Sequence, residues 1–347
     1  MIQGKANTAL TIGRLQTVKL SIGICAHNEE ANIEQVIYRV LEQTKTVGDY
    51  EVVVVASGCT DRTVEIVKDI AEKEPEISLI VEGKRKGKAN ALNLLFQNLH
   101  GEVYVQIDAD AIPAPGAINI LLDRLEDSRV GAASALPTLT NSRSAAAKIN
   151  ETLWGLHNLT QLVLNREGRT GHLSGQLFAI RRSLCYAIPK DVVNDDAFLA
   201  LRSTGMGYNL IFEPRAIVFV NPANTFRDLL IQRTRIVYGH FMLRRLTGRL
   251  PRVFETCTAK EKVLILSIWV KGRKKEIPRL FVLASLELIA HVLARTDLRN
   301  SNSGNPHTSW AVATTTKRRL TSSRTLQNNL SFIKASGRAD TLETRLR

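Results

Sequence analysis

Short apolar runs alternate with helical patterns through the first third of the chain. The runs occupy residues 20–25, 51–55, 77–81 and 103–107, and each ends at a polar cluster. After the first three, apolar residues recur at helical spacing, as they do in 33–41. Apolar runs this short, bounded by turn residues, are typical of buried strands. Because strands and helices alternate, we predict right-handed βαβ crossovers and an α/β fold, mainly a parallel sheet with helices on both faces.

The pattern changes after residue 108. Pro113 and Pro115 are expected to end the fourth strand, since proline cannot donate to a sheet. Helices are predicted at 118–125, at 142–165 and from residue 195 onward. Strands are predicted at 130–135, 171–180, 208–212 and 216–220, with Pro214 separating the last two. The α/β region is therefore expected to extend to residue 226.

The last third of the chain carries the positive charge. Residues 1–226 have 23 Lys/Arg against 25 Asp/Glu, 227–295 have 15 against 5, and 296–347 have 9 against 3, which together give the formal charge of +14. The apolar runs 263–270 and 280–293 flank a cationic stretch, a composition typical of amphipathic helices on an anionic membrane surface. A second core packed on the α/β domain is the alternative.

These patterns divide the chain into four parts. We expect an N-terminal extension at 1–17, a catalytic domain at 18–226, a basic helical region at 227–295 and a disordered tail at 296–347, where Ser, Thr, Asn and Arg dominate. No apolar run is long enough for a signal peptide or a spanning helix. Because the four cysteines are widely separated, we expect reduced thiols and a cytoplasmic protein.

Two carboxylates one residue apart follow the fourth strand. Asp108 and Asp110 stand where ligands bind in open α/β sheets, at the carboxyl end of a strand. Carboxylate oxygens are the ligands that Mg²⁺ and Mn²⁺ prefer, so the pair is a candidate metal site. A solvated Asp-Ala-Asp turn explains the same residues without a metal.

Two further segments are candidates for the site. The loop 83–88 consists of glycines and cations (GKRKGK), and such a loop suits a diphosphate. A solvated charge run is the alternative. Asp195 and Asp196 open a predicted helix, where capping and the helix dipole alone explain acidic residues.

Six segments occur in the order seen in family 2 glycosyltransferases. They are 26–30 (AHNEE), 56–61 (ASGCTD), 87–93 (GKANALN), 108–110 (DAD), 195–199 (DDAFL) and 232–235 (QRTR). The chain resembles this family over about residues 18–240. The resemblance implies the nucleotide-diphospho-sugar transferase (GT-A) fold, a UDP-sugar donor, a divalent metal (Mn²⁺ or Mg²⁺) and inversion at the anomeric carbon.

The resemblance also implies a role for individual residues. The nucleotide-sugar-binding set is His27, Glu29, Ser57, Asp61, Lys88 and Asp108. Asp110, with Asp108, would hold the metal. Asp196, with Asp195 before it, resembles the catalytic base. The residues for the diphosphate and acceptor are Gly175, Gln232, Arg233 and Arg235.

Two departures from the family pattern narrow the expected activity. Ala56-Ser57 stands where many members have an Asp pair, so base recognition must differ. Ile236 stands where processive synthases have Trp, and clear membrane spans are missing. We therefore expect non-processive transfer to a lipid-linked or polysaccharide hydroxyl, by an enzyme peripheral to the inner face of the cell membrane.

Three alternatives remain open from the sequence. In a haloacid-dehalogenase-type phosphatase, Asp108 would be the nucleophile of D-x-D-x-T, but Ile112 occupies the Thr position. A non-catalytic basic module would bind acidic lipid or nucleic acid through the C-terminal third, but no zinc motif or aromatic platform accompanies the charges, so we expect no nucleic acid. A dehydrogenase would need G-x-G-x-x-G after the first strand, and none is there.

Overall fold

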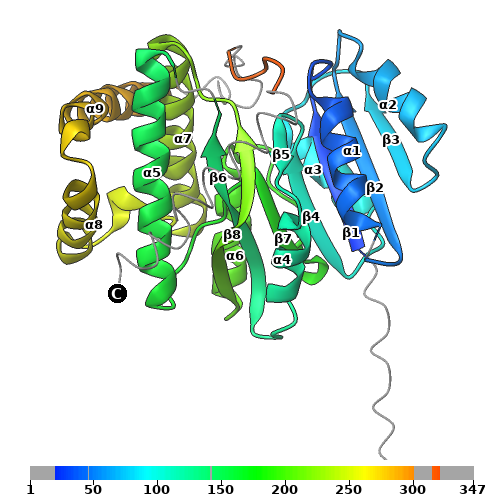
Figure 1. The fold of residues 1–347 in the computed structure, drawn as a ribbon, viewed down its shortest axis with the longest axis horizontal. Coiled ribbons are helices and arrows are strands. Elements are labelled where there is room, and N and C mark those ends of the chain that lie inside the picture. Colours follow the sequence, from blue (N-terminus) through cyan, green and yellow to red (C-terminus); the bar gives the residue numbers. More distant parts are fainter. Residues whose placement is uncertain (1–19, 46, 141–142, 301–314, 321–347) are drawn as a thin grey trace, which may run out of the picture.

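One sheet organises the part of the chain that the computed structural model describes, residues 20–45, 47–140, 143–300 and 315–320. Its eight strands have the order β3-β2-β1-β4-β7-β6-β8-β5 (Figure 1). The strands are β1 (Leu20–Ala26), β2 (Tyr50–Ser57), β3 (Ile77–Glu82), β4 (Val103–Asp108), β5 (Ala111–Pro113), β6 (Val130–Leu139), β7 (Leu177–Arg181) and β8 (Asn209–Val220). The predicted α/β fold is confirmed.

Helices cover both faces of this sheet and form a group at one end of it (Figure 1). The α-helices are α1 (Ile33–Thr44), α2 (Thr63–Ala71), α3 (Lys88–Gln97), α4 (Ala117–Arg124), α5 (Ala145–Arg166), α6 (Asp195–Gly205), α7 (Phe226–Thr247), α8 (Ala259–Gly272) and α9 (Ile277–Asn300). The short 3₁₀ helices are η1 (Arg182–Leu184), η2 (Phe254–Thr256) and η3 (Lys274–Glu276).

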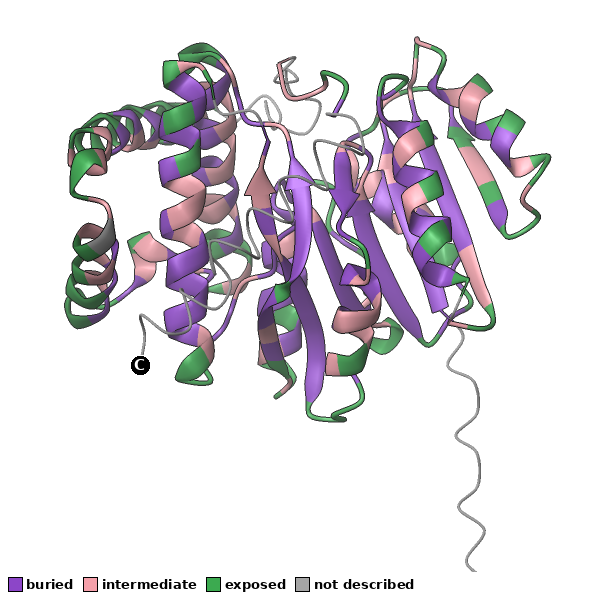
Figure 2. Ribbon diagram, in the orientation of Figure 1, coloured by how far each residue is buried: buried purple, intermediate pink, exposed green. Residues whose placement is uncertain are grey.

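Strands β1, β2 and β4 are buried on both faces, as their continuous apolar runs predict. In β2, Val52 and Val54 join the core beneath α1, α2 and α4, whereas Val53 and Val55 join the core beneath α3 and α6. Figure 2 shows this burial as purple along the central strands. The two-residue alternation of side chains therefore supplies two cores from one run of valines.

Three expectations about strands are wrong. Residues 209–220 form one strand, because Pro214 sits in a bulge where the pairing jumps from Ala135↔Glu213 to Leu136↔Ile217 and no ladder hydrogen bond is required of it. The chain after β4 does not simply break at the prolines, since β5 pairs antiparallel with β8. The glycines at 171–175 precede β7 and lie outside it.

The sheet is mixed. The pairings within β3-β2-β1-β4 and between β6 and β8 are parallel, whereas β7 runs antiparallel to β4 and β6. The parallel half supplies adjacent carboxyl ends, which is what the site requires.

Helices α5, α7, α8 and α9 form the group beyond β6, on the left of Figure 1. Leu283 and Leu286 of α9 pack with Leu229 of α7, and Ile265 and Trp269 of α8 pack against α5. The predicted basic region thus packs on the protein through one face, and its other face carries exposed apolar residues: Val263, Leu264, Phe281, Val282, Leu288, Ile289, Val292 and Leu293.

The predicted disordered tail is wrong in two segments. Helix α9 continues to Asn300. Residues 315–320 return to the sheet, where Leu320 is buried in the main core and its N–H donates to Asn32. The predicted extension 1–17 and the remainder of the tail lie outside the described residues.

Candidate active site

Parallel strand pairing gathers polar residues from four strands at one edge of the sheet. Ala56 lies opposite Ala26, Glu82 opposite Ser57, and Asp108 opposite Cys25. The residues that directly follow each strand therefore meet at the same edge, in the crevice where α/β proteins bind ligands.

Lys88 forms ion pairs with two of the predicted site acids, which lie on different elements. Its Nζ lies 2.8 Å from Asp108 Oδ1 and 3.5 Å from Asp195 Oδ2. Burial opposes the ammonium charge, but the attraction of Asp108 and Asp195 outweighs it and raises the pKa of Lys88 above its usual value. Gly87, whose φ of +97° suits glycine, places this lysine at the start of α3.

Asp196 lies beside this group with its carboxylate facing Gly175. Its Oδ1 accepts a 2.7 Å hydrogen bond from the N–H of Ala197. A Cβ on Gly175 would come within 2.9 Å of Asp196 Oδ2, so only glycine leaves that oxygen its present room. Burial raises the pKa of Asp196 above the ordinary value of an aspartate.

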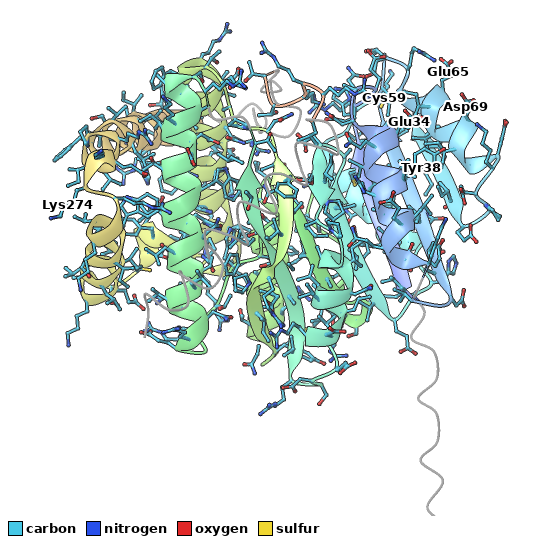
Figure 3. All side chains as sticks on the ribbon, viewed as in Figure 1. Glu34, Tyr38, Cys59, Glu65, Asp69 and Lys274 are labelled. Carbon is cyan, nitrogen blue, oxygen red and sulfur yellow. The ribbon has the colours of Figure 1, made fainter. Side chains whose placement is uncertain are left out.

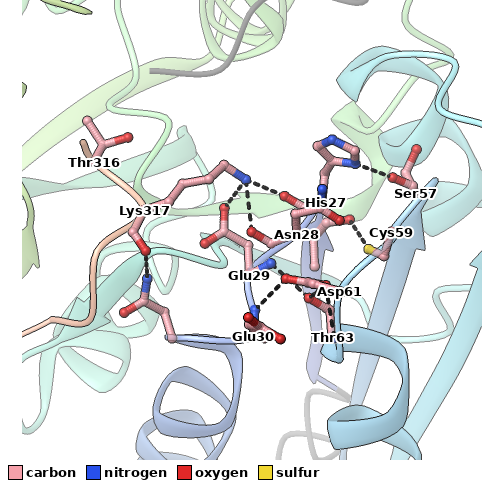
Figure 4. A network of polar contacts seen from close by, with 12 residues as sticks. His27, Asn28, Glu29, Glu30, Ser57, Cys59, Asp61, Thr63, Thr316 and Lys317 are labelled. Atoms are coloured by element: carbon pink, nitrogen blue, oxygen red, sulfur yellow. Dashed lines mark hydrogen bonds and ion pairs between the residues drawn. The ribbon is translucent and has the colours of Figure 1, made fainter. Parts of the chain in front are cut away.

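Glu29 and Asp110 form a second acidic pair. The ammonium group of Lys317 lies against Glu29 (Figure 4). Lys317 Nζ lies 2.6 Å from Glu29 Oε1 and also donates to the main-chain oxygens of His27 and Asn28. Glu29 Oε2 is buried with no hydrogen-bond partner among the described residues. Burial raises the pKa of both carboxyls, and their mutual repulsion raises that of Glu29 further.

Hydrogen bonds connect the loops that were predicted to bind the nucleoside. His27 Nδ1 donates to Ser57 O over 2.7 Å, and burial lowers the pKa of this imidazole. Ser57 Oγ donates to Glu82 Oε2 over 2.6 Å. Asp61 accepts from Thr63 and from the N–H of Glu30, so its carboxylate ties the two loops together.

The two arginines of segment 232–235 on α7 point in different directions. Arg235 faces the acids: burial lowers the pKa of its guanidinium to about 10, against the opposing attraction of Asp195 and Asp196. Arg233 turns away and pairs with Glu287 of α9 and with Glu255. Gln232 lines the cavity described next.

A cavity of about 710 Å³ links the acids to the C-terminal helices. Its inner end is formed by Lys88, Asp108, Asp195, Asp196 and Arg235. Helices α8 and α9 line its outer end with the apolar Leu266, Leu280, Phe281, Leu283 and Ala284 and with the charged Lys262 and Glu287. Gly175 and Gln232 lie on its wall. The predicted acceptor residues and the predicted base thus share one cavity.

The carboxylates near Asp110 suit a divalent cation. Asp110, Glu29 and Asp108 supply hard oxygen ligands, and one buried oxygen of Glu29 lacks a partner. They are not preformed: within the described residues, no group of three or more His, Cys, Asp or Glu side chains is already arranged for a metal. Two lysines now neutralise Asp108 and Glu29.

Sequence reasoning missed four members of this site. Glu82 ends β3, so the rule that found Asp108 would have found it. Asn90 donates to Glu82 over 2.6 Å from the first turn of α3. Lys317 and His172 gave no signal, because one lies in a polar tail and the other in a glycine-rich loop.

The chain matches known proteins over its first two thirds. Residues 21–188 match the family described as Glycosyl transferase family 2. A probable glycosyltransferase, YdaM of Bacillus subtilis (strain 168), is 29% identical over 234 residues, which are 64% of this chain and 55% of that protein. A poly-beta-1,6-N-acetyl-D-glucosamine synthase of Staphylococcus aureus (strain COL) is 25% identical over 224 residues, 62% of this chain and 53% of the synthase. The chain thus spans about half the length of these relatives.

A solved structure shares the fold. The mannosyltransferase PcManGT from Pyrobaculum calidifontis, in complex with GDP-Man and Mn²⁺, superposes with a TM-score of 0.56 at 23% identity, over 95% of this chain and 85% of that one. The sheet order, the carboxylates at the strand ends and the family match agree. The chain has a GT-A fold, and its residues 21–188 are similar to glycosyl transferase family 2.

Proposed function

We propose that this enzyme transfers a sugar, with inversion, from a nucleotide-diphospho-sugar to a hydroxyl group, with Asp196 as the base. The observation that carries this proposal is the position of Asp196. It lines the inner end of the cavity together with Lys88 and Asp108, so it can reach a hydroxyl that enters from the C-terminal helices. Its raised pKa makes the carboxylate a better proton acceptor than an exposed aspartate.

Each residue at the inner end of the cavity has a separate role in the proposed reaction. Asp196 Oδ2 takes the acceptor hydroxyl proton while the oxygen bonds to the anomeric carbon, and the bond from that carbon to the diphosphate oxygen breaks. Lys88 and Arg235 place positive charge near the departing diphosphate. A Mn²⁺ or Mg²⁺ ion bound by Asp110 and Asp108 would supply further charge there. Asp195 holds Lys88 in place.

Donor selection falls to the loops after β1 and β2. His27, Glu29, Ser57 and Asp61 would surround the nucleoside, with main-chain groups and Ser57 in place of the family's Asp pair. We propose UDP as the nucleotide. Ile236, in place of a Trp platform, supports transfer of one or a few sugars to a lipid-linked or saccharide acceptor.

Membrane attachment is proposed through the outer faces of α8 and α9. The expectation that no segment could span a membrane is wrong: the helical segment Lys274–Asn300 is long and apolar enough to cross one. An 18-residue window within it has a mean hydropathy of 1.7, and 22% of that window is buried. Because Glu287 and Leu283 of α9 contact α7, a position in the plane of the membrane interface fits better than a span. Lys274, at the outer end of the α8–α9 connection (Figure 3), has neighbouring cations suited to anionic lipid.

A donor screen tests this function. Thermal unfolding is measured with UDP-, GDP- and ADP-sugars, each with and without Mn²⁺. We expect a UDP-sugar to raise Tm only when Mn²⁺ is present, and Asp110→Ala to remove that increase. A Tm that no nucleotide sugar raises would contradict the proposed donor, and an unchanged response of Asp110→Ala would contradict the proposed metal ligand.

Attachment is tested separately by flotation of the full chain with vesicles of phosphatidylglycerol and phosphatidylcholine. We expect binding that falls with added salt. Equal binding to neutral and anionic vesicles would contradict the role of the cations.

A further inference from the structure

The cavity changes character along its length. Its inner end is charged, whereas five of the seven residues of α8 and α9 that line the cavity are apolar: Leu266, Leu280, Phe281, Leu283 and Ala284, against Lys262 and Glu287. A soluble sugar acceptor would gain little from such an opening, because hydrocarbon cannot replace the hydrogen bonds its hydroxyls make with water. The opening suits a hydrocarbon chain.

The middle of the cavity holds buried polar atoms that lack partners. They are His157 Nε2, His172 Nδ1, Ser174 Oγ and Gln176 Oε1, and none has a hydrogen-bond partner within the described part of the chain. Buried polar groups are normally satisfied, so this set indicates a ligand. Burial lowers the pKa of both imidazoles, to about 4 for His172, and they are therefore neutral at physiological pH. Neutral donors and acceptors suit uncharged hydroxyls.

The apolar opening continues onto an exposed apolar surface. Phe281 is 71% exposed and Leu288, two turns further along α9, is 68% exposed. On α8, Val263 is 68% exposed. Contiguous exposure of large apolar side chains is unusual on a soluble monomer and marks a binding surface. The hydrocarbon chain of a ligand that leaves the cavity here would stay in contact with apolar side chains, and at a bilayer surface with lipid.

Building on the proposed function, we propose that the acceptor is an amphiphile. Its hydroxyl-bearing head lies between Asp196 and the pair His157 and His172, and its apolar chain leaves the cavity between Leu266 and Phe281. The head supplies the hydroxyl proton that Asp196 accepts, and the new glycosidic bond forms at that oxygen. The cavity volume of about 710 Å³ is in the range of about 300–1,000 Å³ typical of small-molecule sites.

Alkyl glucosides test the proposal without knowledge of the natural acceptor. Binding of ethyl, hexyl and octyl β-glucoside to the full chain is measured by calorimetry below the critical micelle concentrations. We expect affinity to rise by about fourfold for each buried methylene. Equal affinity for ethyl and octyl glucoside would overturn the proposal.

A matched pair of variants on α9 tests where the alkyl chain of the ligand leaves the cavity. Ala284 lines the cavity and is exposed at its opening, so Ala284→Trp blocks the exit without disturbing the core. Ser285, the next residue, is exposed and lies outside the cavity lining, so Ser285→Trp is the control. We expect Ala284→Trp to abolish the dependence on chain length and Ser285→Trp to retain it. Equal losses in both variants would place the apolar contact on the outer surface and overturn the proposal.

A second measurement separates this inference from the proposed function. Binding of UDP with Mn²⁺ should be unchanged in both α9 variants, because the donor residues lie at the other end of the cavity. If octyl and ethyl glucoside bind equally while UDP still binds, the proposal of an amphiphilic acceptor is wrong and the proposed transferase function is retained. If UDP does not bind to the unmodified protein, the donor proposal itself fails.

Discussion

The ion pair between Arg233 and Glu287 is expected to hold α9 against α7. Arg233 Nε lies 2.5 Å from Glu287 Oε1, and a second guanidinium nitrogen lies 3.1 Å from Oε2, which makes the pair bidentate. The Arg233 side chain is only 9% exposed. Glu287→Gln would leave a buried guanidinium with Glu255, at 3.3 Å, as its acidic partner.

The expected cost follows from the burial of the charge. Removing one partner of a buried ion pair typically costs about 3–5 kcal/mol, because the other charge stays desolvated. Glu255 retains part of the attraction, so we expect a loss of about 2–3 kcal/mol in the free energy of unfolding. Arg233→Met combined with Glu287→Leu should recover most of it, since well-packed apolar residues often replace such pairs at little cost.

Urea denaturation, followed by circular dichroism, measures this loss as a shift in midpoint at constant slope. The control is Glu65→Gln, which removes a solvent-exposed pair with Arg62 on α2, on the far side of the molecule from α9 (Figure 3). We expect no measurable shift for the control. A Glu287→Gln midpoint as high as that of Glu65→Gln would refute the reasoning.

Three further predictions concern the acids at the strand ends. Lys317→Ala should lower the Tm of the metal-free protein and enlarge the Tm increase caused by Mn²⁺, because the ammonium competes for Glu29; an equal Mn²⁺ response in both proteins would contradict this. Gly175→Ala should lower kcat at least tenfold with little change in Tm, because its Cβ displaces the Asp196 carboxylate; unchanged kcat would show that Oδ2 is not the proton acceptor. The raised pKa of Asp196 places the acid limb of kcat/KM above pH about 3.9, the ordinary value for Asp. Activity should fall as the pH drops through that raised pKa, and a limb at or below the ordinary value would contradict the assignment.

Sequence periodicity was sufficient for the parallel half of the sheet. Strands β1, β2 and β4 are buried on both faces, and such strands read as continuous apolar runs, whereas β3 at the edge of the sheet is partly exposed. The polar residues after β1, β2 and β4 could therefore be assigned to one edge. The two-strand reading of 208–220 failed because a bulge at Pro214 keeps one strand continuous, and local pattern does not reveal how a partner strand is offset.

Long-range contacts account for what the sequence could not predict. Arg233 belongs to the recognised QRTR segment, yet its partner Glu287 lies 54 residues away on another helix. Lys317 reaches Glu29 from a polar tail with no apolar periodicity. The unpartnered atoms of His157 and His172 become visible only when the cavity around them is known.

Single-turnover transfer by Asp196→Asn tests the central claim most directly. The asparagine keeps the shape of the side chain and its hydrogen bond with Ala197, but it cannot accept the hydroxyl proton. The donor identified by the screen is mixed with Mn²⁺ and acceptor, and release of the nucleoside diphosphate is followed beside donor binding. We predict binding within about twofold of the unmodified protein and release slowed by at least about a hundredfold, the lower range for general base catalysis. Near-normal release by Asp196→Asn would contradict the account.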